Sequence, residues 1–365
     1  MGSFLRDFRD ELGDTYLLGG VRVILGVLLF GNALRAAREL EDQYFGDVFH
    51  WPLFPDALVP SRAVYACLVL AQLLLAVLVV AGYLARPALF ASGVIGAYVL
   101  LCDRLQFHHN RYALFVDVFL LAFAPCDRSF LIAGEGERPR IGPLWAARLT
   151  QLQCSIIYLA SGGSKLFDPD WRAGLVLAER FRLYGQHAID AGVPARLIEW
   201  LSSPAATSAL SKLAIATELF LAAGLWMRRT RVFALWWGVW FHLTIEATSR
   251  VEGFTWLTFA VYVLFVTPDI RARKLFYDSS RWKGRAVARL VSWLDWLARF
   301  ETKPWAPDAV RKGHAVVIVR RDGTHATGLG ALAMVARATP LLFPLWGPLF
   351  LVASFTKGGD ANVNA

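Results

Sequence analysis

The sequence predicts an all-α polytopic membrane bundle of about eight transmembrane helices, followed by a small C-terminal cytoplasmic α/β tail. Of the 365 residues, 56% are hydrophobic and only 18% are charged, and the mean hydropathy is +0.44. Soluble proteins carry about 25% charged residues. The chain also has 14 tryptophans, a residue that gathers at membrane interfaces. These observations indicate that lipid is the surrounding solvent.

Each predicted span is an apolar stretch of roughly the 20 residues that a helix needs to cross a bilayer. In order, the stretches are Tyr16–Ala36, Ala63–Tyr83, Pro87–Arg104, Tyr112–Pro125, Leu144–Leu166, Ala205–Trp226, Val232–Ala247 and Phe254–Thr267. The fourth and the seventh are short. Residues 329–355 could form a ninth span, but Pro340, Pro344 and Pro348 favour a packed tail because proline breaks helices.

Basic residues in the loops predict the orientation. Arg86, the arginines of 228–231 and the basic residues after 270 fall on one side of an eight-span bundle. The positive-inside rule makes that side cytoplasmic, so both termini are expected inside. The net charge of +9 is therefore interpreted as topology and attraction to anionic lipid, and no nucleic-acid partner is expected.

Three regions are expected along the chain. Residues 1–270 form the transmembrane domain, and 271–310 form a basic amphipathic linker at the membrane interface. Residues 311–365 form the small tail. In that tail His314–Arg321 alternates as a strand does, and Asp322-Gly323 supplies a turn.

Ionisable residues at membrane depth suggest function, and the first cluster joins the third and fourth predicted spans. Its members are Asp103, His108, His109, Asn110 and Tyr112. Such side chains could polarise a carbonyl or relay a proton. The alternative is an ordinary polar loop at the interface.

The second cluster contains Lys165 at the end of the fifth predicted span, followed by Asp170 and Trp171. Desolvation at such a place favours the neutral amine, which can act as a base. The alternative is a lysine that extends its ammonium group to the lipid headgroups.

The third cluster lies on the seventh predicted span and its exit. His242, Glu246 and Arg250 are four residues apart and share one helix face. With Glu218 and Asp117 they could form a buried polar network that is catalytic, ion-conducting or structural. No metal is predicted, because no HExxH motif occurs and His242 with Glu246 is too small a ligand set for zinc. The four cysteines form no CxxC pair and are interpreted as core residues.

Residues along 15–270 carry a family resemblance. They include Arg22 and Gly26, His50–Leu53, Asp103–Tyr112, Tyr158, Gly163–Gly174, Phe241-His242 and Gly253-Phe254. Of these, Lys-Leu-x-x-x-Asp-Trp-x-x-Gly, from Lys165 onwards, is the most specific. The sequence resembles the vitamin K-dependent γ-carboxylase family, whose bacterial relatives are the HTTM (horizontally transferred transmembrane domain) proteins.

The resemblance implies an oxidoreductase or carboxylase (a lyase) of a bacterial inner membrane that uses a reduced quinone of the vitamin K or menaquinol type. Lys165 would be the base that deprotonates the quinol, and the oxidised quinol would remove a γ-proton from a glutamate of a peptide or protein substrate. The implied catalytic set is Lys165, His109, Asn110 and His242. The implied substrate- and quinone-binding residues are His108, Tyr112, Asp103, Asp170, Trp171 and Trp51.

The chain departs from this family at one motif. Asn-Asn-His-x-Tyr of the carboxylases reads His108-His109-Asn110-Arg111-Tyr112 here, so Asn110 stands at the position of the functional histidine. The lumenal β-domain of the animal enzymes has no counterpart either. These departures favour an alternative, a non-catalytic scaffold for peptide maturation, immunity or partner binding. A small-solute transporter is a third reading, although no inverted repeat occurs.

The tail carries a second resemblance. Val316–Phe355 is similar to the C-terminal half of the DCC family of thiol-disulfide oxidoreductases, which have a thioredoxin-like fold. The matching residues include Arg320–Gly323, Gly328 and Ala331-Leu332. The redox CxxC of that family is missing, so no dithiol chemistry is expected.

Overall fold

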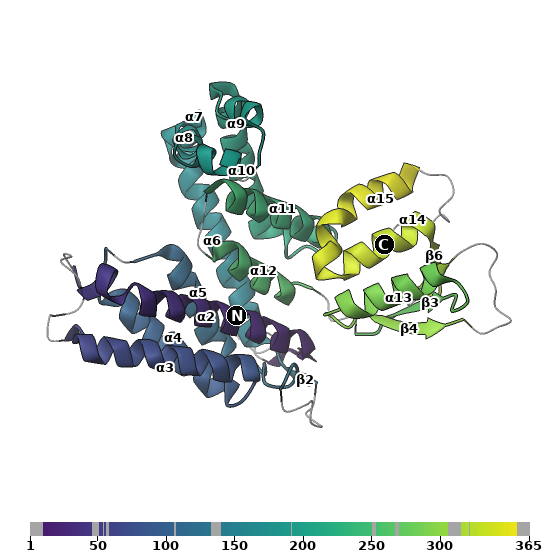
Figure 1. The fold of residues 1–365 in the computed structure, drawn as a ribbon, viewed down its shortest axis with the longest axis horizontal. Helices are drawn as coiled ribbons and strands as arrows, with labels where there is room; N and C mark the ends of the chain where they lie inside the picture. The colour runs from purple at the N-terminus through teal and green to yellow at the C-terminus, as the bar shows by residue number, and fades with distance from the viewer. Residues whose placement is uncertain are drawn as a thin grey trace. The chain divides into compact units, whose positions relative to one another are not determined.

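A computed structural model describes residues 10–45, 51–53, 55, 58–105, 107–132, 140–190, 192–249, 253–266, 270–305, 315–320 and 322–355. The chain forms two compact units, residues 1–266 and 267–365. Helices dominate the first unit, whereas the second combines helices with a sheet (Figure 1).

The first unit begins with a short strand and continues as helices. Its larger helices are α2 (Tyr16–Arg38), α3 (Arg62–Ala81), α4 (Ala85–Leu101), α5 (His109–Leu121), α6 (Trp145–Phe167), α8 (Leu175–Asp190), α10 (Pro204–Gly224), α11 (Arg231–Ser249) and α12 (Phe254–Leu264). The smaller elements are β1 (Leu12–Asp14), a π-helical turn (Leu40–Phe45), β2 (Ile141–Pro143), α7 (Pro169–Ala173) and α9 (Ala195–Leu201). Strands β1 and β2 pair antiparallel.

Local sequence explains where the helices begin and end. Ser203 caps α10 through its hydroxyl, which accepts a hydrogen bond from the Ala206 amide, and Pro204 occupies the first helical position. Helix α3 ends at Gly82, whose φ of +78° is the left-handed conformation that glycine adopts readily.

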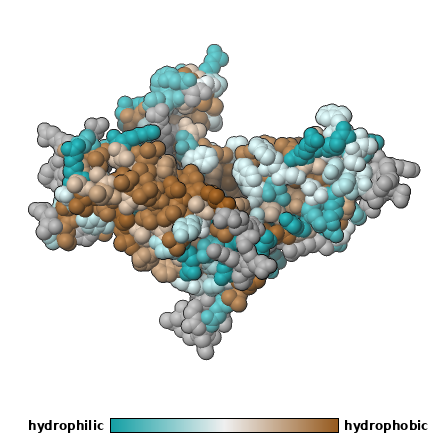
Figure 2. Space-filling model, turned by 60° about the horizontal axis from the view of Figure 1, so that its bottom comes forward, coloured by the Kyte–Doolittle hydropathy of each residue, from teal (hydrophilic) through white to brown (hydrophobic). Residues whose placement is uncertain are grey.

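The core of the first unit lies among α2, α3, α4, α5 and α12. Leu25, Val79, Leu89 and Val118 are almost completely buried in it. The outer faces of the same helices are apolar too, for example at Leu74 on α3, and Figure 2 shows a broad hydrophobic surface over this part of the molecule. Helices that are apolar on both faces are typical of membrane spans.

Three described helices are long and apolar enough to cross a membrane, namely α2, α3 and α10. Helices α4 and α12 are apolar but shorter. These findings confirm a helical membrane protein. The eight crossings and the cytoplasmic placement of both termini stay predictions.

The second unit contains a four-stranded sheet. Its elements are β3 (Arg273–Tyr277), α13 (Trp282–Leu294), β4 (Phe300–Pro304), β5 (Val316–Val319), β6 (His325–Thr327), α14 (Gly328–Ala338), a 3-10 segment (Pro340–Leu345) and α15 (Trp346–Phe355). The strand order is β4-β3-β5-β6, in which β3 and β4 are parallel and the other pairs are antiparallel. Of the predicted strand His314–Arg321, Val316–Val319 forms β5, whereas His314 and Arg321 lie outside the described residues. Gly323, with a φ of +80°, lies in the predicted turn between β5 and β6.

The described part of the predicted linker, residues 271–305, differs from a lone amphipathic helix because it also contains two strands, whereas its placement at a membrane interface stays a prediction. Strands β3 and β4 belong to the same sheet as β5, and Leu275, Val291, Phe300 and Ile318 share one core. The difference arises because α13 has a buried apolar face as well as an exposed one, and sequence pattern alone shows only that the helix is amphipathic. The DCC resemblance stays a prediction.

The proline-rich run 329–355 is not one continuous helix. Helix α14 ends at Ala338, the 3-10 segment begins at Pro340, and α15 follows at Trp346. The α-helix is interrupted at Pro340 because proline has no amide hydrogen to donate to a carbonyl of the preceding turn.

Candidate active site

One face of α6 supplies the polar side chains of the candidate site. Tyr158, Ser161 and Lys165 are spaced by three and four residues, so they lie above one another on the helix surface. The polar positions point towards α10, α11 and α12, as their contacts show.

Lys165 lies at the centre of a closed set of hydrogen bonds. Its Nζ atom is 2.5 Å from Glu218 Oε1 on α10 and 2.8 Å from Ser161 Oγ. Ser161 Oγ in turn donates to Glu218 Oε1 at 3.1 Å. The side chains of Lys165 and Glu218 are only 18% and 7% exposed, so the ion pair is largely shielded from solvent. Shielding strengthens such a pair, because water no longer screens its charges.

Helix α7 places an aromatic ring beside this pair. The Lys165 ammonium lies 4.9 Å from the centre of the Trp171 ring, within the range of a cation–π interaction. Asp168 caps α7, because its Oδ1 atom accepts hydrogen bonds from the amides of Asp170 and Trp171 at 2.8 and 3.3 Å. Asp170 itself is exposed.

Gly174 fixes α7 against α10. Its φ is +86°, and a Cβ atom at this position would lie 2.4 Å from the backbone nitrogen of Ser208. Only glycine permits both this conformation and this approach. The short helix that carries Trp171 is therefore in direct backbone contact with the helix that carries Glu218.

A second chain of hydrogen bonds lies farther along the same face of α6. Tyr158 Oη is 2.6 Å from His242 Nε2 on α11 and 2.6 Å from Tyr262 Oη on α12. His242 is 1% exposed. The Nδ1 atom of His242 and the Oε2 atom of Glu218 are both buried and have no hydrogen-bond partner among the described residues. Buried polar atoms without partners are uncommon in folded proteins and mark places where a ligand or water would bind.

The first predicted cluster occupies a different place. His108, His109 and Tyr112 are exposed at the start of α5, where the His109 ring packs edge-on against Phe107. In Figure 1 the start of α5 lies at one end of the α2–α5 group, whereas α7 lies at the far end of α6. His242 thus contacts the polar face of α6, whereas His109 and Asn110 lie at the start of α5. Their catalytic roles stay predictions.

Asp103 and Trp51 hold a loop together. Asp103 is 1% exposed, and its Oδ1 atom accepts hydrogen bonds from the amides of Trp51 at 3.1 Å and Leu105 at 2.9 Å. The Arg104 guanidinium lies 5.1 Å from the centre of the Trp51 ring. These contacts tie the segment before α3 to the end of α4.

The predicted polar network is only partly connected. Glu218 joins Lys165, whereas Asp117 is buried on α5 and Glu246 Oε2 is buried on α11 without a partner among the described residues. Arg250 lies outside the described residues. Sequence reasoning missed Tyr262, although a tyrosine inside an apolar span signals a buried hydroxyl that needs a partner.

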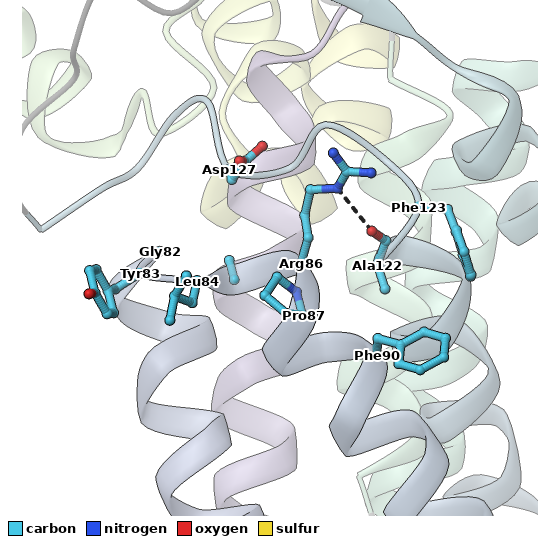
Figure 3. A pocket seen from close by; sticks show the side chains of 10 residues that line it. Gly82, Tyr83, Leu84, Arg86, Pro87, Phe90, Ala122, Phe123 and Asp127 are labelled. Carbon is cyan, nitrogen blue, oxygen red and sulfur yellow. Dashed lines mark hydrogen bonds between the residues drawn. The ribbon is translucent and has the colours of Figure 1, made fainter.

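A pocket of about 590 Å³ lies elsewhere in the first unit (Figure 3). It opens at the turn between α3 and α4, beside the end of α5, and its lining includes Tyr83, Phe90, Phe123 and Asp127. Arg86 also lines it and donates a hydrogen bond from Nε to the Ala122 carbonyl at 3.0 Å. None of the Lys165 contacts belongs to this pocket.

The fold and the site define a helical membrane protein with a shielded lysine–glutamate pair. The family model described as HTTM domain matches residues 12–270, and the chain belongs to this family. No match was found among curated proteins or among solved structures.

Proposed function

We propose that the chain is a carboxylase-related membrane enzyme that uses a reduced quinone, with Lys165 as the base. The observation that carries the proposal is the shielded contact of Lys165 with Glu218, Ser161 and Trp171. Membership of the HTTM family supports the carboxylase-related class. The expected setting is a bacterial inner membrane, with the site facing away from the cytosol.

Glu218 gives Lys165 a way to become a base. Transfer of one proton from Lys165 Nζ to Glu218 Oε1, across their 2.5 Å hydrogen bond, leaves a neutral amine and a neutral carboxylic acid. The neutral amine then has a lone pair that can accept a proton from an acidic hydroxyl. Ser161 donates to Glu218 and keeps the carboxyl oriented towards Nζ.

The surrounding residues fit a reduced quinone. Trp171 offers a flat aromatic face next to Lys165, and Glu218 Oε2 and His242 Nδ1 are buried polar atoms without partners among the described residues. A bound quinol would supply a hydroxyl proton and, with oxygen, the strong base needed to remove a γ-proton from a glutamate. Tyr158 holds His242 through Nε2, which fixes the ring and leaves Nδ1 for a ligand. Asp170, on the same short helix as Trp171, is kept as a proposed quinone contact.

The test is quinol turnover by the purified full chain in lipid nanodiscs. Menaquinol oxidation and epoxide formation would be compared between wild type and Lys165→Ala, and we expect a loss of 10²- to 10⁴-fold, roughly what general-base groups contribute. Lys212→Ala is the matched control, because Lys212 is an exposed lysine on the same helix as Glu218. Equal turnover in wild type and Lys165→Ala would show that the mechanism is wrong.

A non-catalytic scaffold is the second candidate. The closed pairing of Lys165 with Glu218 favours it, because an ion pair also serves to join α6 to α10. Such a protein would assist peptide maturation, confer immunity or bind a partner through the same domain. Absence of quinol turnover in the wild type, together with crosslinking of a co-expressed secreted peptide, would favour this function.

A further inference from the structure

Helix α13 of the second unit has two opposite apolar faces. Gly284, Ala288, Val291 and Leu294 are buried against the sheet. Trp282, Leu290 and Trp293 point away from it and are 68%, 49% and 70% exposed. At 100° per residue, Trp282 and Trp293 lie at the centre of the exposed face, opposite Val291.

Cations flank this exposed face on both sides. Lys283 lies on one side of the two tryptophans and Arg289 on the other, next to Trp282, and both side chains are exposed. The helix from Trp282 to Leu294 contains no acidic residue. Arg285 belongs to the same side as Arg289 but donates to the carbonyls of Ser279 and Ser280, so Lys283 and Arg289 are the cations best placed to meet a partner.

The partner that this surface fits is an anionic lipid bilayer. Tryptophan rings prefer the level of the lipid headgroups, and basic side chains beside them attract anionic lipids. The first unit also keeps the second unit close to a membrane. Residues 265–272 join α12 to β3, and a chain of that length spans at most about 30 Å.

We propose that the exposed face of α13 docks the second unit on the surface of an anionic bilayer. The proposal depends on the chain being a membrane protein, and it is independent of any quinol chemistry at Lys165. A soluble unit tied to a membrane by a short connection needs only weak attraction to stay on the surface, because its effective concentration there is already high.

The experiment places a fluorescent label on the face and asks what surrounds it. The label is attached to Ala286→Cys, an exposed position between the two tryptophans, in a Cys67→Ala background where the remaining cysteines are buried. The control label is attached to His325→Cys, which is exposed on β6. The full chain is placed in nanodiscs of phosphatidylcholine, with or without phosphatidylglycerol, and quenched by nitroxide lipids or by aqueous iodide.

We expect the label at 286 to be quenched by nitroxide lipids and protected from iodide when phosphatidylglycerol is present. The label at 325 should show the opposite behaviour. Lys283→Glu with Arg289→Glu should weaken docking by at least about 25-fold, roughly fivefold for each cation removed. The charge-conserving pair Lys283→Arg with Arg289→Lys should behave as wild type. Raising the salt to about 0.5 M should also weaken docking, because it screens the charges.

Two results would overturn the proposal. If iodide quenches the label at 286 equally in both lipid compositions, the face is in water and docks on nothing. If the label is protected from iodide yet is not quenched by nitroxide lipids, protein covers the face, either from the first unit or from a second copy.

Discussion

Two cations of the first unit, the fully buried Arg22 and the largely shielded Lys165, are stabilised in different ways. Arg22 is fully buried on α2, and the hydrogen bonds of its guanidinium to the described residues go to backbone carbonyls. The acceptors are Val79, Val80 at 3.0 Å, Cys126 at 3.1 Å, Ser129 at 3.1 Å and Phe130 at 2.6 Å. Lys165 is instead paired with a carboxylate, a hydroxyl and an aromatic ring.

The difference separates a charge whose partners cannot take up a proton from a charge whose partner can. Carbonyl oxygens cannot take up a proton, so Arg22 can only bind the end of α3 to the loop that follows α5. These carbonyls are at a helix end and a loop, where the backbone lacks its own donors. Glu218 can exchange a proton with Lys165, and buried unpaired atoms lie nearby. The residue that looks most unusual by burial alone is therefore the one without proton chemistry.

Arg22→Met should have the largest effect on stability. It would remove the shared donor of five carbonyls, of which Val79 keeps a hydrogen bond from the Gly82 amide, and we expect a loss of about 3–5 kcal/mol, as for breaking a buried charge interaction. Thermal unfolding in detergent, or the yield of folded protein, measures this loss. Arg35→Met is the matched control on α2, because Arg35 is a partly exposed arginine that pairs with Glu39 one turn along the helix. Equal melting temperatures for the two variants would contradict the structural role of Arg22.

Lys165→Met should have the next largest effect, because it leaves Glu218 charged and largely buried. We expect a loss of about 2–4 kcal/mol, of which the double variant Lys165→Met with Glu218→Leu should recover at least half. Unfolding of the two single variants and the double variant forms a double-mutant cycle. A coupling free energy near zero would mean that the pair does not stabilise the fold in the membrane.

Tyr158→Phe tests how much the second chain of hydrogen bonds contributes to stability. It removes the hydroxyl that joins His242 to Tyr262, and we expect a loss of about 1–2 kcal/mol because both partners stay buried. Tyr112→Phe is the control, since Tyr112 is exposed and should change stability by less than about 0.5 kcal/mol. A Tyr158→Phe protein as stable as the control would show that His242 and Tyr262 find other partners.

Loss of the Glu11–Arg148 pair should have the smallest effect on stability. The hydrogen bond from Arg148 lowers the pKa of the Glu11 carboxyl, despite partial burial that opposes this shift. A lowered folded-state pKa means that the stabilisation is present above the unfolded pKa and is lost as the pH falls through the folded pKa. The pair is about one-third exposed, so the contribution should be below about 1 kcal/mol.

Unfolding measured between neutral pH and about pH 3 should show a shallower loss of stability in Glu11→Gln than in wild type. Arg182 and Glu179 supply a more exposed pair for comparison, with side chains that are 68% and 53% exposed, and Glu179→Gln should have the smaller effect. A steeper loss in Glu11→Gln than in wild type would contradict the assignment.

The sequence predicted the helices better than the contacts between them. The stretch Tyr16–Ala36 is close to α2, and the run ending at Leu166 is close to α6, because apolar length is a local property. The bond between Lys165 and Glu218 joins residues 53 positions apart and depends on how α6 packs against α10. Lys165 and His242 were predicted as site residues, but the sequence did not predict that Lys165 binds Glu218 or that His242 binds Tyr158.

The sheet of the second unit was the least predictable part. Strand β3 pairs in parallel with β4, with α13 between them, and such pairing leaves no hairpin signal in the sequence. Strand β5 was predicted because it alternates and precedes a tight turn. Arg273 and Lys274 made β3 look like part of a basic linker, although Leu275 beside them is fully buried.

Gly174 has a consequence for how a molecule could reach Lys165. Because its backbone rests directly on Ser208, α7 cannot swing away at this end without breaking that contact. Trp171 therefore forms a fixed wall and not a moving lid. A ligand of this site would have to arrive through the side that α7 leaves uncovered, with the Trp171 ring staying in place.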